Sequence, residues 1–227
     1  MFSEDQVNEA LNEIKTPDVT GWDLFSEVPN FKVYRRVVPN SALKEYKVLG
    51  TYNDLSTRYL LRAYTDLDFR KSWDKNMIDW TALENHRLHF TAKFPWPLSP
   101  RDYVYELRVQ EFKGGVVCVN GKSVNDESMP ERSGTVRVDE FRQDVVIQPT
   151  PDGNGCNVWF GYYDNPKGNI PSSIINWAAR SGVPAFLSSL REAGHSLMKK
   201  DAEEAGQNEK ARPLSMNGTP NPVSVDC

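Results

Sequence analysis

The chain has 227 residues, of which 39% are hydrophobic and 26% charged, with a formal net charge of −4 and a pI near 5.5. This acidic balance argues against a general nucleic-acid-binding protein, because such a protein needs a basic face to displace counterions from phosphates. No apolar run approaches the ~18 residues that a membrane span requires, and the acidic, amphipathic start MFSEDQVNEALNEI does not resemble a signal peptide.

Three widely spaced cysteines, Cys118, Cys156 and Cys227, form no CxxC motif. Such an odd, scattered set is typical of free thiols in a reducing compartment, so we expect a cytoplasmic protein. Aromatic residues make up 11% of the chain. They could build a broad apolar wall or simply fill a core.

The first predicted element is a helix, because Ser3 and Gln6 match a capping box and apolar residues at 7, 10, 11 and 14 follow helical spacing up to Pro17. Alternating runs at 31–38 and 45–52 then predict a β-hairpin. Ser56 is expected to cap a short helix over 57–64, and residues 66–74 read as a turn or a second short helix.

From about residue 77 the hydrophobic period changes to two, which predicts seven strands near 78–84, 86–94, 102–112, 116–123, 133–141, 144–149 and 156–163. Their short, turn-rich connections favour antiparallel pairing. Residues 171–200 predict one long helix with an apolar stripe and a kink at Pro184. The segment 201–227 has little apolar periodicity, so we expect a disordered tail. The fold class is therefore α+β, with a curved antiparallel sheet of about nine strands around a long C-terminal helix; a sheet curved in this way leaves a cavity where side chains do not fill it.

Six segments in this order resemble the START lipid-transfer domains: FSEDQVNEAL, EYKVLGTY, DFRKSWD, FPWPLSPRDYVY, ERSGTVRV and YYDNPKGNIPSSIINWAARSGVPAFL. The resemblance covers about residues 2–200, so it implies a START domain over 1–200 and a tail over 201–227. It implies a helix-grip fold in which the sheet and the C-terminal helix enclose one lipid in a tunnel. The function it implies is that of an intracellular carrier of one glycerophospholipid, with phosphatidylcholine favoured, which touches membranes transiently and needs no cofactor.

The resemblance also implies that Arg70 meets the lipid phosphate, with Asp74 beside it. A phosphodiester charge is costly to bury alone, and a guanidinium offers a fixed fork of donors that stays charged. Asp74 lies one helical turn further on and could hold that fork in place. From spacing alone, a weak surface ion pair is the alternative.

A trimethylammonium group has no N–H to donate, so aromatic faces are the groups that can hold it. The resemblance implies a choline cage of Phe90, Tyr103 and Phe141, with Gln143 near the head group. Strand parity predicts that each ring shares a face with its alternate neighbours. The family has tryptophan and tyrosine where this chain has Phe90 and Phe141, and we expect these two changes to weaken cation binding by roughly 1 kcal/mol.

The predicted gate is the loop and helix that follow residue 162, with Gly168 as a hinge and Pro184 as a kink. Lys199 and Lys200 would suit contact with anionic head groups, or they simply complement the helix dipole. In the 93–100 segment, Phe94 and Trp96 are expected to form wall or rim. At the start of the next strand, Arg101 and Asp102 are expected to form a structural pair.

An enzyme is the main alternative class, but the sequence contains no GxSxG or HExxH motif and only three histidines. His86 and His89 are expected on opposite sides of one strand, a poor arrangement for a metal, and His195 is expected to complement a helix dipole. We therefore expect no catalysis and no metal. A sterol carrier and a lipid-sensing regulator on the same fold remain open, although Arg70 and the cage aromatics speak against a sterol.

Overall fold

The structure is a computed structural model and describes residues 4–41 and 43–211. Its α-helices are α1 (Glu4–Lys15), α2 (Thr57–Thr65), α3 (Leu67–Trp73), α4 (Ser172–Trp177) and α5 (Val183–Ala211). Its strands are β1 (Asp23–Val28), β2 (Phe31–Val37), β3 (Lys44–Tyr52), β4 (Met77–Ala82), β5 (Arg87–Ala92), β6 (Arg101–Phe112), β7 (Val116–Ser123), β8 (Val136–Val138), β9 (Phe141–Pro149) and β10 (Cys156–Asp164).

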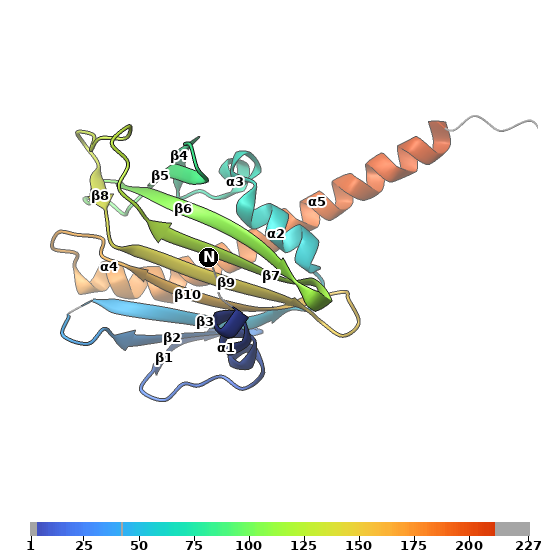
Figure 1. The fold of residues 1–227 in the computed structure, drawn as a ribbon, viewed down its shortest axis with the longest axis horizontal. Helices are drawn as coiled ribbons and strands as arrows, with labels where there is room; N and C mark the ends of the chain where they lie inside the picture. Colours follow the sequence, from blue (N-terminus) through green and yellow to red (C-terminus); the bar gives the residue numbers. More distant parts are fainter. Residues whose placement is uncertain (1–3, 42, 212–227) are drawn as a thin grey trace, which may run out of the picture.

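All ten strands belong to one sheet with the order β1-β2-β3-β10-β9-β7-β6-β5-β4, while β8 pairs with β6 (Figure 1). Neighbours in this order are antiparallel, and the predicted β2–β3 hairpin is confirmed. The short strand β8 is the exception, since it lies parallel to β6. The α+β fold class and the large antiparallel sheet with a long C-terminal helix are confirmed, and the sheet is not closed into a barrel.

Two details of the strand prediction are wrong. The edge strand β1 was not expected, because its sequence DLFSEV lacks a clear two-residue alternation. The predicted strands 133–141 and 144–149 differ from the observed ones, because β8 covers three residues and β9 runs without a break from Phe141 to Pro149.

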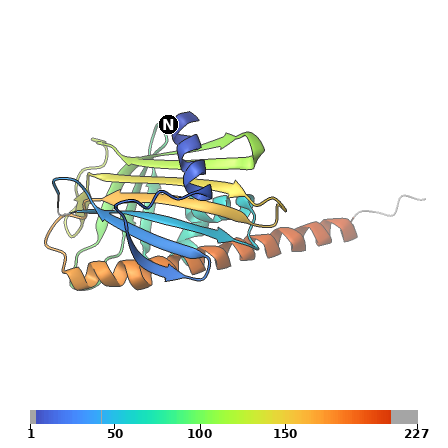
Figure 2. The ribbon, with the colours of Figure 1, turned by 90° about the horizontal axis from the view of Figure 1, so that it is seen from below.

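The sheet carries helices on both faces (Figure 2). On the inner face, α2 and α5 pack against the central strands in the largest apolar cluster, which includes Leu60, Val145, Ile147, Val158 and Leu190. On the outer face, Val7 and Ala10 of α1 pack against Val116, Cys118 and Val146. Alternate residues of β9 therefore point to opposite sides, as the pleat requires.

The predicted helix over 171–200 is interrupted by a π-helical turn, Ala178–Gly182, which separates α4 from α5. Pro184 is the second residue of α5 and cannot donate a backbone hydrogen bond to the preceding turn, so the expected irregularity lies just before it.

The helix α5 continues to Ala211, so the prediction that it ends at residue 200 is wrong. Its last turns carry Lys199–Glu203 and Lys200–Glu204 pairs at helical spacing, which stabilise a helix without an apolar stripe. The rest of the predicted tail, 212–227, lies outside the described residues, as does Ser3 of the predicted capping box. In the described ranges, no helix combines the length and the apolar character needed to cross a membrane.

Candidate functional site

Arg70 and Asp74 form an ion pair at the end of α3. Asp66 caps the start of this helix by accepting a hydrogen bond from the Phe69 amide. The segment 66–74, predicted as a turn or a short helix, therefore contains a helix. Arg70 Nε donates to Asp74 Oδ2 over 3.0 Å, and the two side chains are only 14% and 5% exposed. The pair is therefore buried, unlike the surface ion pair that the spacing also allowed.

Three rings surround the Arg70 guanidinium. Its carbon lies 5.1 Å from the ring centre of Tyr64, 5.6 Å from that of Phe90 and 5.4 Å from that of Phe186. These rings come from α2, β5 and α5, so the charge lies where the helices meet the inner face of the sheet. Aromatic faces stabilise a cation in such a place through their quadrupoles.

The structure brings together all three rings predicted for the cage. Phe90 and Tyr103 are cross-strand partners with ring centres 6.3 Å apart, and Phe141 lies 5.3 Å from Tyr103. They belong to one apolar cluster that also contains Leu88 and Ala92, which share the Phe90 face as strand parity predicts. The rings meet edge to face at contact distance, with positive edges against negative faces.

Two residues of β10 at the edge of this cluster, the 37% exposed Tyr162 and the partly buried Asp164, were not predicted. The Tyr162 ring lies 5.9 Å from that of Phe141, and Asp164 is the cross-strand partner of Phe141. The hydroxyls of Tyr103 and Tyr162 both donate to Asp164 Oδ2, over 3.1 and 3.0 Å. Burial raises the pKa of Asp164, and these hydrogen bonds offset only part of that effect. Alternation along β10 would have placed both residues on the inner face, but only the β9–β10 register reveals their neighbour.

Gln143 links the cluster to the Arg70 end of the site. Its Oε1 accepts a hydrogen bond of 3.0 Å from the Tyr64 hydroxyl, and Tyr64 in turn faces the Arg70 guanidinium. A side chain at Gly121 would meet the Gln143 Cγ at 2.9 Å, so the glycine leaves the room that Gln143 occupies. Burial raises the pKa of Tyr64, which keeps its hydroxyl protonated and able to donate.

Comparison with known proteins identifies the family. The family model described as "START domain" matches residues 3–200 of the chain. The chain belongs to the START domain family. Mouse phosphatidylcholine transfer protein is 38% identical to this START domain protein over 208 residues, which cover 88% of this chain and 96% of that protein. Human phosphatidylcholine transfer protein is 36% identical with the same coverage. The crystal structure of human STARD10 superposes with a TM-score of 0.75 at 18% identity and covers 94% of this chain and 90% of that one, which shows a shared fold.

The predicted pair of Arg101 and Asp102 at the start of β6 is wrong, because successive strand residues face opposite sides of the sheet. In this START domain, Arg101 donates to the carbonyls of Pro166 and Lys167 over 2.9 and 3.0 Å and to that of Ser99 over 2.6 Å. It thereby joins the loop before β6 to the loop before α4.

Asp102 belongs to a network on the other side of the sheet. Its Oδ2 lies 3.1 Å from His89 Nε2 and accepts hydrogen bonds of 3.1 and 2.8 Å from Arg137. Arg137 also donates to the carbonyl of Met129, which ties the loop before β8 to the sheet.

The two predicted gate residues lie on either side of α4 and the π-helical turn, Gly168 in the loop after β10 and Pro184 in α5. Gly168 has a φ of +76°, in the left-handed region that favours glycine, and Pro184 is partly buried in the first turn of α5. Of the residues expected to form wall or rim, Phe94 lies under the Arg101 guanidinium at 4.5 Å, whereas Trp96 is 91% exposed.

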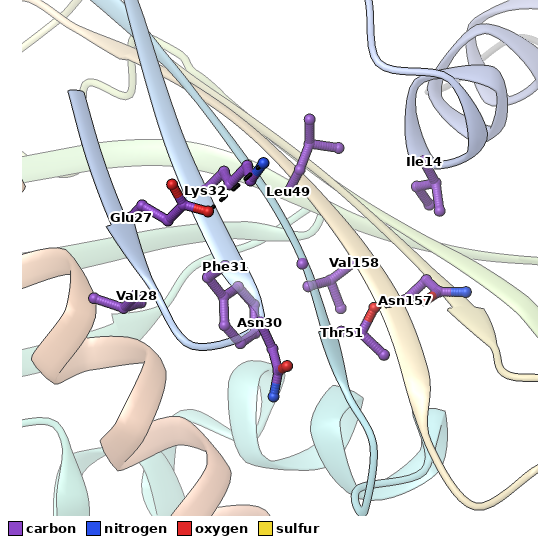
Figure 3. A pocket seen from close by; sticks show the side chains of 11 residues that line it. Ile14, Glu27, Val28, Asn30, Phe31, Lys32, Leu49, Thr51, Asn157 and Val158 are labelled. Atoms are coloured by element: carbon purple, nitrogen blue, oxygen red, sulfur yellow. Dashed lines mark hydrogen bonds and ion pairs between the residues drawn. The ribbon is translucent and has the colours of Figure 1, made fainter. Parts of the chain in front are cut away.

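Two pockets open away from the predicted site. One, of about 310 Å³, lies between the end of α1, the β1–β2 turn and strands β3 and β10, and Figure 3 shows Lys32 and Glu27 paired at its edge. The other, of about 640 Å³, lies beside α2 and the turn after β6. Neither is lined by a predicted head-group residue, so the enclosed tunnel stays a prediction.

The three histidines take up different positions. His86 lies in the turn before β5 with a φ of +60°, so it does not share a strand with His89. His89 is fully buried against Asp102, and His195 lies 3.2 Å from Asp54. In residues 4–41 and 43–211, no three His, Cys, Asp or Glu side chains gather closely enough to hold a metal ion.

Proposed function

We propose that this START domain carries one glycerophospholipid, with phosphatidylcholine preferred, in the space between the inner face of the sheet and α5. The single observation that carries the proposal is the buried Arg70–Asp74 pair beside a cluster of aromatic rings. A buried guanidinium suits a phosphate, and neighbouring rings suit a quaternary ammonium group. The 36–38% identity to proteins named phosphatidylcholine transfer protein supports the same ligand.

In this proposal the head group lies across the site in an extended manner. Arg70, oriented by Asp74, binds the phosphate, and Tyr64 with Gln143 supplies further polar groups beside it. Phe90, Tyr103 and Phe141 hold the choline, and the rings must separate from their present edge-to-face contacts to admit it. Phosphatidylethanolamine would bring three N–H donors against mostly apolar rings, which favours choline.

The acyl chains would lie along apolar side chains that are only partly buried. Leu107, Phe160 and Phe186 belong to the inner-face cluster and yet keep accessible surface. Because the chains leave a bilayer in which they are already dry, the apolar term nearly cancels, and selectivity falls to the head group.

The gate in this proposal is the segment from Gly168 to Pro184, which contains the π-helical turn. Arg101 fixes the two residues just before this segment by donating to the carbonyls of Pro166 and Lys167. A variant rigidified at Gly168 and Pro184 is expected to transfer lipid more slowly between membranes, and transfer at the full rate would remove this gate.

A carrier rather than an enzyme is proposed, because the relatives of 36–38% identity are named phosphatidylcholine transfer protein. The described thiols of Cys118 and Cys156 are free and buried, which suits a reducing compartment such as the cytoplasm. A lipid-sensing regulator would use the same pocket and is the second candidate.

The test is mass spectrometry of lipid extracted from the purified protein, followed by uptake from vesicles. We expect phosphatidylcholine in the wild type and none retained by Arg70→Ala, while Lys71→Ala, an exposed neighbour on the same helix, retains it. Tyr103→Ala should lower the preference for choline lipids more than total uptake. Sterol, or no lipid, in the wild type would refute the proposal.

A further inference from the structure

The carboxylate of Asp164 lies beside aromatic rings and forms no ion pair with the described residues, although the charge of the buried Arg101 guanidinium acts on it from farther away. It accepts hydrogen bonds from Tyr103 and Tyr162, whose rings both lie against that of Phe141. In the part of the chain that the structure describes, no lysine, arginine or histidine nitrogen lies within 4.0 Å of its oxygens. A partly buried carboxylate without a cation is unfavourable, and the two hydroxyls solvate the charge without neutralising it.

We infer that Asp164 supplies the counter-charge for the cationic head group of the bound lipid and so determines its selectivity. The inference rests on the proposed function and adds to it a carboxylate, Asp164, that attracts the positive charge of the head group. A quaternary ammonium cannot hydrogen-bond to a carboxylate, but it is attracted by the charge through the rings that enclose it. The hydroxyls of Tyr103 and Tyr162 occupy Oδ2, so the carboxylate is held beside these rings rather than free to turn away.

The site then has a positive end and a negative end. Arg70 lies 5.6 Å from the Phe90 ring, Phe90 lies 6.3 Å from Tyr103, and Tyr103 reaches Asp164 through its hydroxyl. A zwitterion with its phosphate at Arg70 and its ammonium near Tyr103 satisfies both ends. An anionic phospholipid without an ammonium group binds Arg70 through its phosphate but brings no positive charge to the partly buried Asp164.

Acid should weaken this selectivity, because protonation removes the charge. The groups around Asp164 on the inner face are Arg101 and Tyr103 of β6, Tyr162 of β10 and Tyr46 of β3, whereas Tyr163 lies on the opposite face of β10 and donates to Glu140. Burial raises the pKa of each of these tyrosines, so none of them titrates in the acid range. Burial also raises the pKa of Asp164 above the usual 3.8.

The experiment compares lipid uptake from vesicles of equal phosphatidylcholine and phosphatidylglycerol by native mass spectrometry. We expect the ratio of bound phosphatidylcholine to phosphatidylglycerol to fall about tenfold in Asp164→Asn, a change of about 1.4 kcal/mol. Asp164→Glu should keep most of the wild-type ratio, because it keeps the charge. The ratio should fall on acidification in the wild type and stay level in Asp164→Asn.

The matched control is Asp144→Asn. Asp144 is also a partly buried carboxylate whose pKa is raised by burial, but it shares the outer face of β9 with Val146. An unchanged ratio in Asp164→Asn, or an equal fall in Asp144→Asn, would overturn the inference while leaving the carrier proposal intact. A wild type that takes up no phospholipid would instead refute the carrier proposal, and the inference with it. Thermal melting of each lipid-free variant shows whether it is folded. If Asp164→Asn does not fold, the lipid ratio of Asp164→Glu at different pH values tests the inference instead.

Discussion

Two carboxylates at strand ends of the same sheet, Asp102 of β6 and Asp164 of β10, differ in what surrounds them. Asp102 on the outer face forms an ion pair with Arg137 and lies against His89 through its Oδ2, while its buried Oδ1 has no hydrogen-bond partner among the described residues. Asp164 on the inner face accepts hydrogen bonds from two tyrosine hydroxyls and has no ion pair among the described residues, although Arg101 acts on its charge from farther away. A carboxylate that already has an ion pair offers less to a cationic ligand than one that lacks such a pair. The outer network therefore belongs to the scaffold, and the inner cluster is the place to look for a ligand.

The pKa values of the two groups follow from this difference. Burial alone would raise the pKa of Asp102, but the hydrogen bonds from Arg137 and His89 outweigh burial and hold it below the usual 3.8. Burial raises the pKa of Asp164, and its hydroxyl partners do not reverse the shift. The same sheet thus lowers one carboxyl pKa and raises the other.

The largest effect that would sharpen this comparison is on stability. Arg137→Ala leaves Asp102 buried without its main cation, so we expect the free energy of unfolding to fall by roughly 3 kcal/mol. The choline preference should stay unchanged, because the network lies on the opposite face from the rings. Urea unfolding of the lipid-free protein measures the first quantity, and vesicle uptake measures the second.

Arg142→Ala is the control for that change, because its side chain is 59% exposed and its loss should cost less than about 0.5 kcal/mol. If Arg137→Ala altered lipid choice as strongly as Asp164→Asn, the separation between scaffold and site would be wrong.

A second, smaller effect is the pH dependence of stability in the lipid-free protein. Because the pKa of Asp102 is lowered in the folded state, its contribution is present above the unfolded value of 3.8 and is lost as the pH falls through the folded value. Because the pKa of Asp164 is raised, its contribution is present below 3.8 and is lost as the pH rises through the folded value. The free energy of unfolding of Asp164→Asn should therefore fall more steeply on acidification than that of the wild type. Parallel profiles would mean that the two carboxyls do not differ as described.

The smallest expected effect is a gain at the cage. Phe90 is partly buried, so Phe90→Trp has some room and presents a larger π-face to a cation. We expect the affinity for phosphatidylcholine vesicle lipid to rise by up to about fivefold, with Phe90→Leu as the control that lowers it. A lower affinity in Phe90→Trp than in the wild type would show that the ring fills space rather than holding charge.

The candidate site residues were predicted from the family resemblance, and local patterns in the sequence support only part of that choice. The four-residue spacing of Arg70 and Asp74 is a helical spacing, and the helix forms there because Asp66 caps it. Alternation gave Phe90 and Tyr103 their same-face neighbours within each strand, but only the β5–β6 register sets the two rings opposite each other. Asp164 was not predicted as a site residue because its place beside the rings depends on its cross-strand partner Phe141. Arg101 and Asp102 were misjudged as a pair because adjacency in sequence is not adjacency in a pleated strand.

The sequence by itself determined the helix spacings, the strand parities and the family resemblance, since these depend on residues close together along the chain. Only the tertiary structure decided the cross-strand register that sets Asp164 against Phe141 and the parallel pairing of β8 with β6. It also decided the extension of α5 to Ala211, which is supported by the ion pairs of Asp201 with Arg58 and Arg62 of α2. Those features depend on contacts between residues tens of positions apart, and their free energy comes from burial and charge pairing that no local pattern encodes.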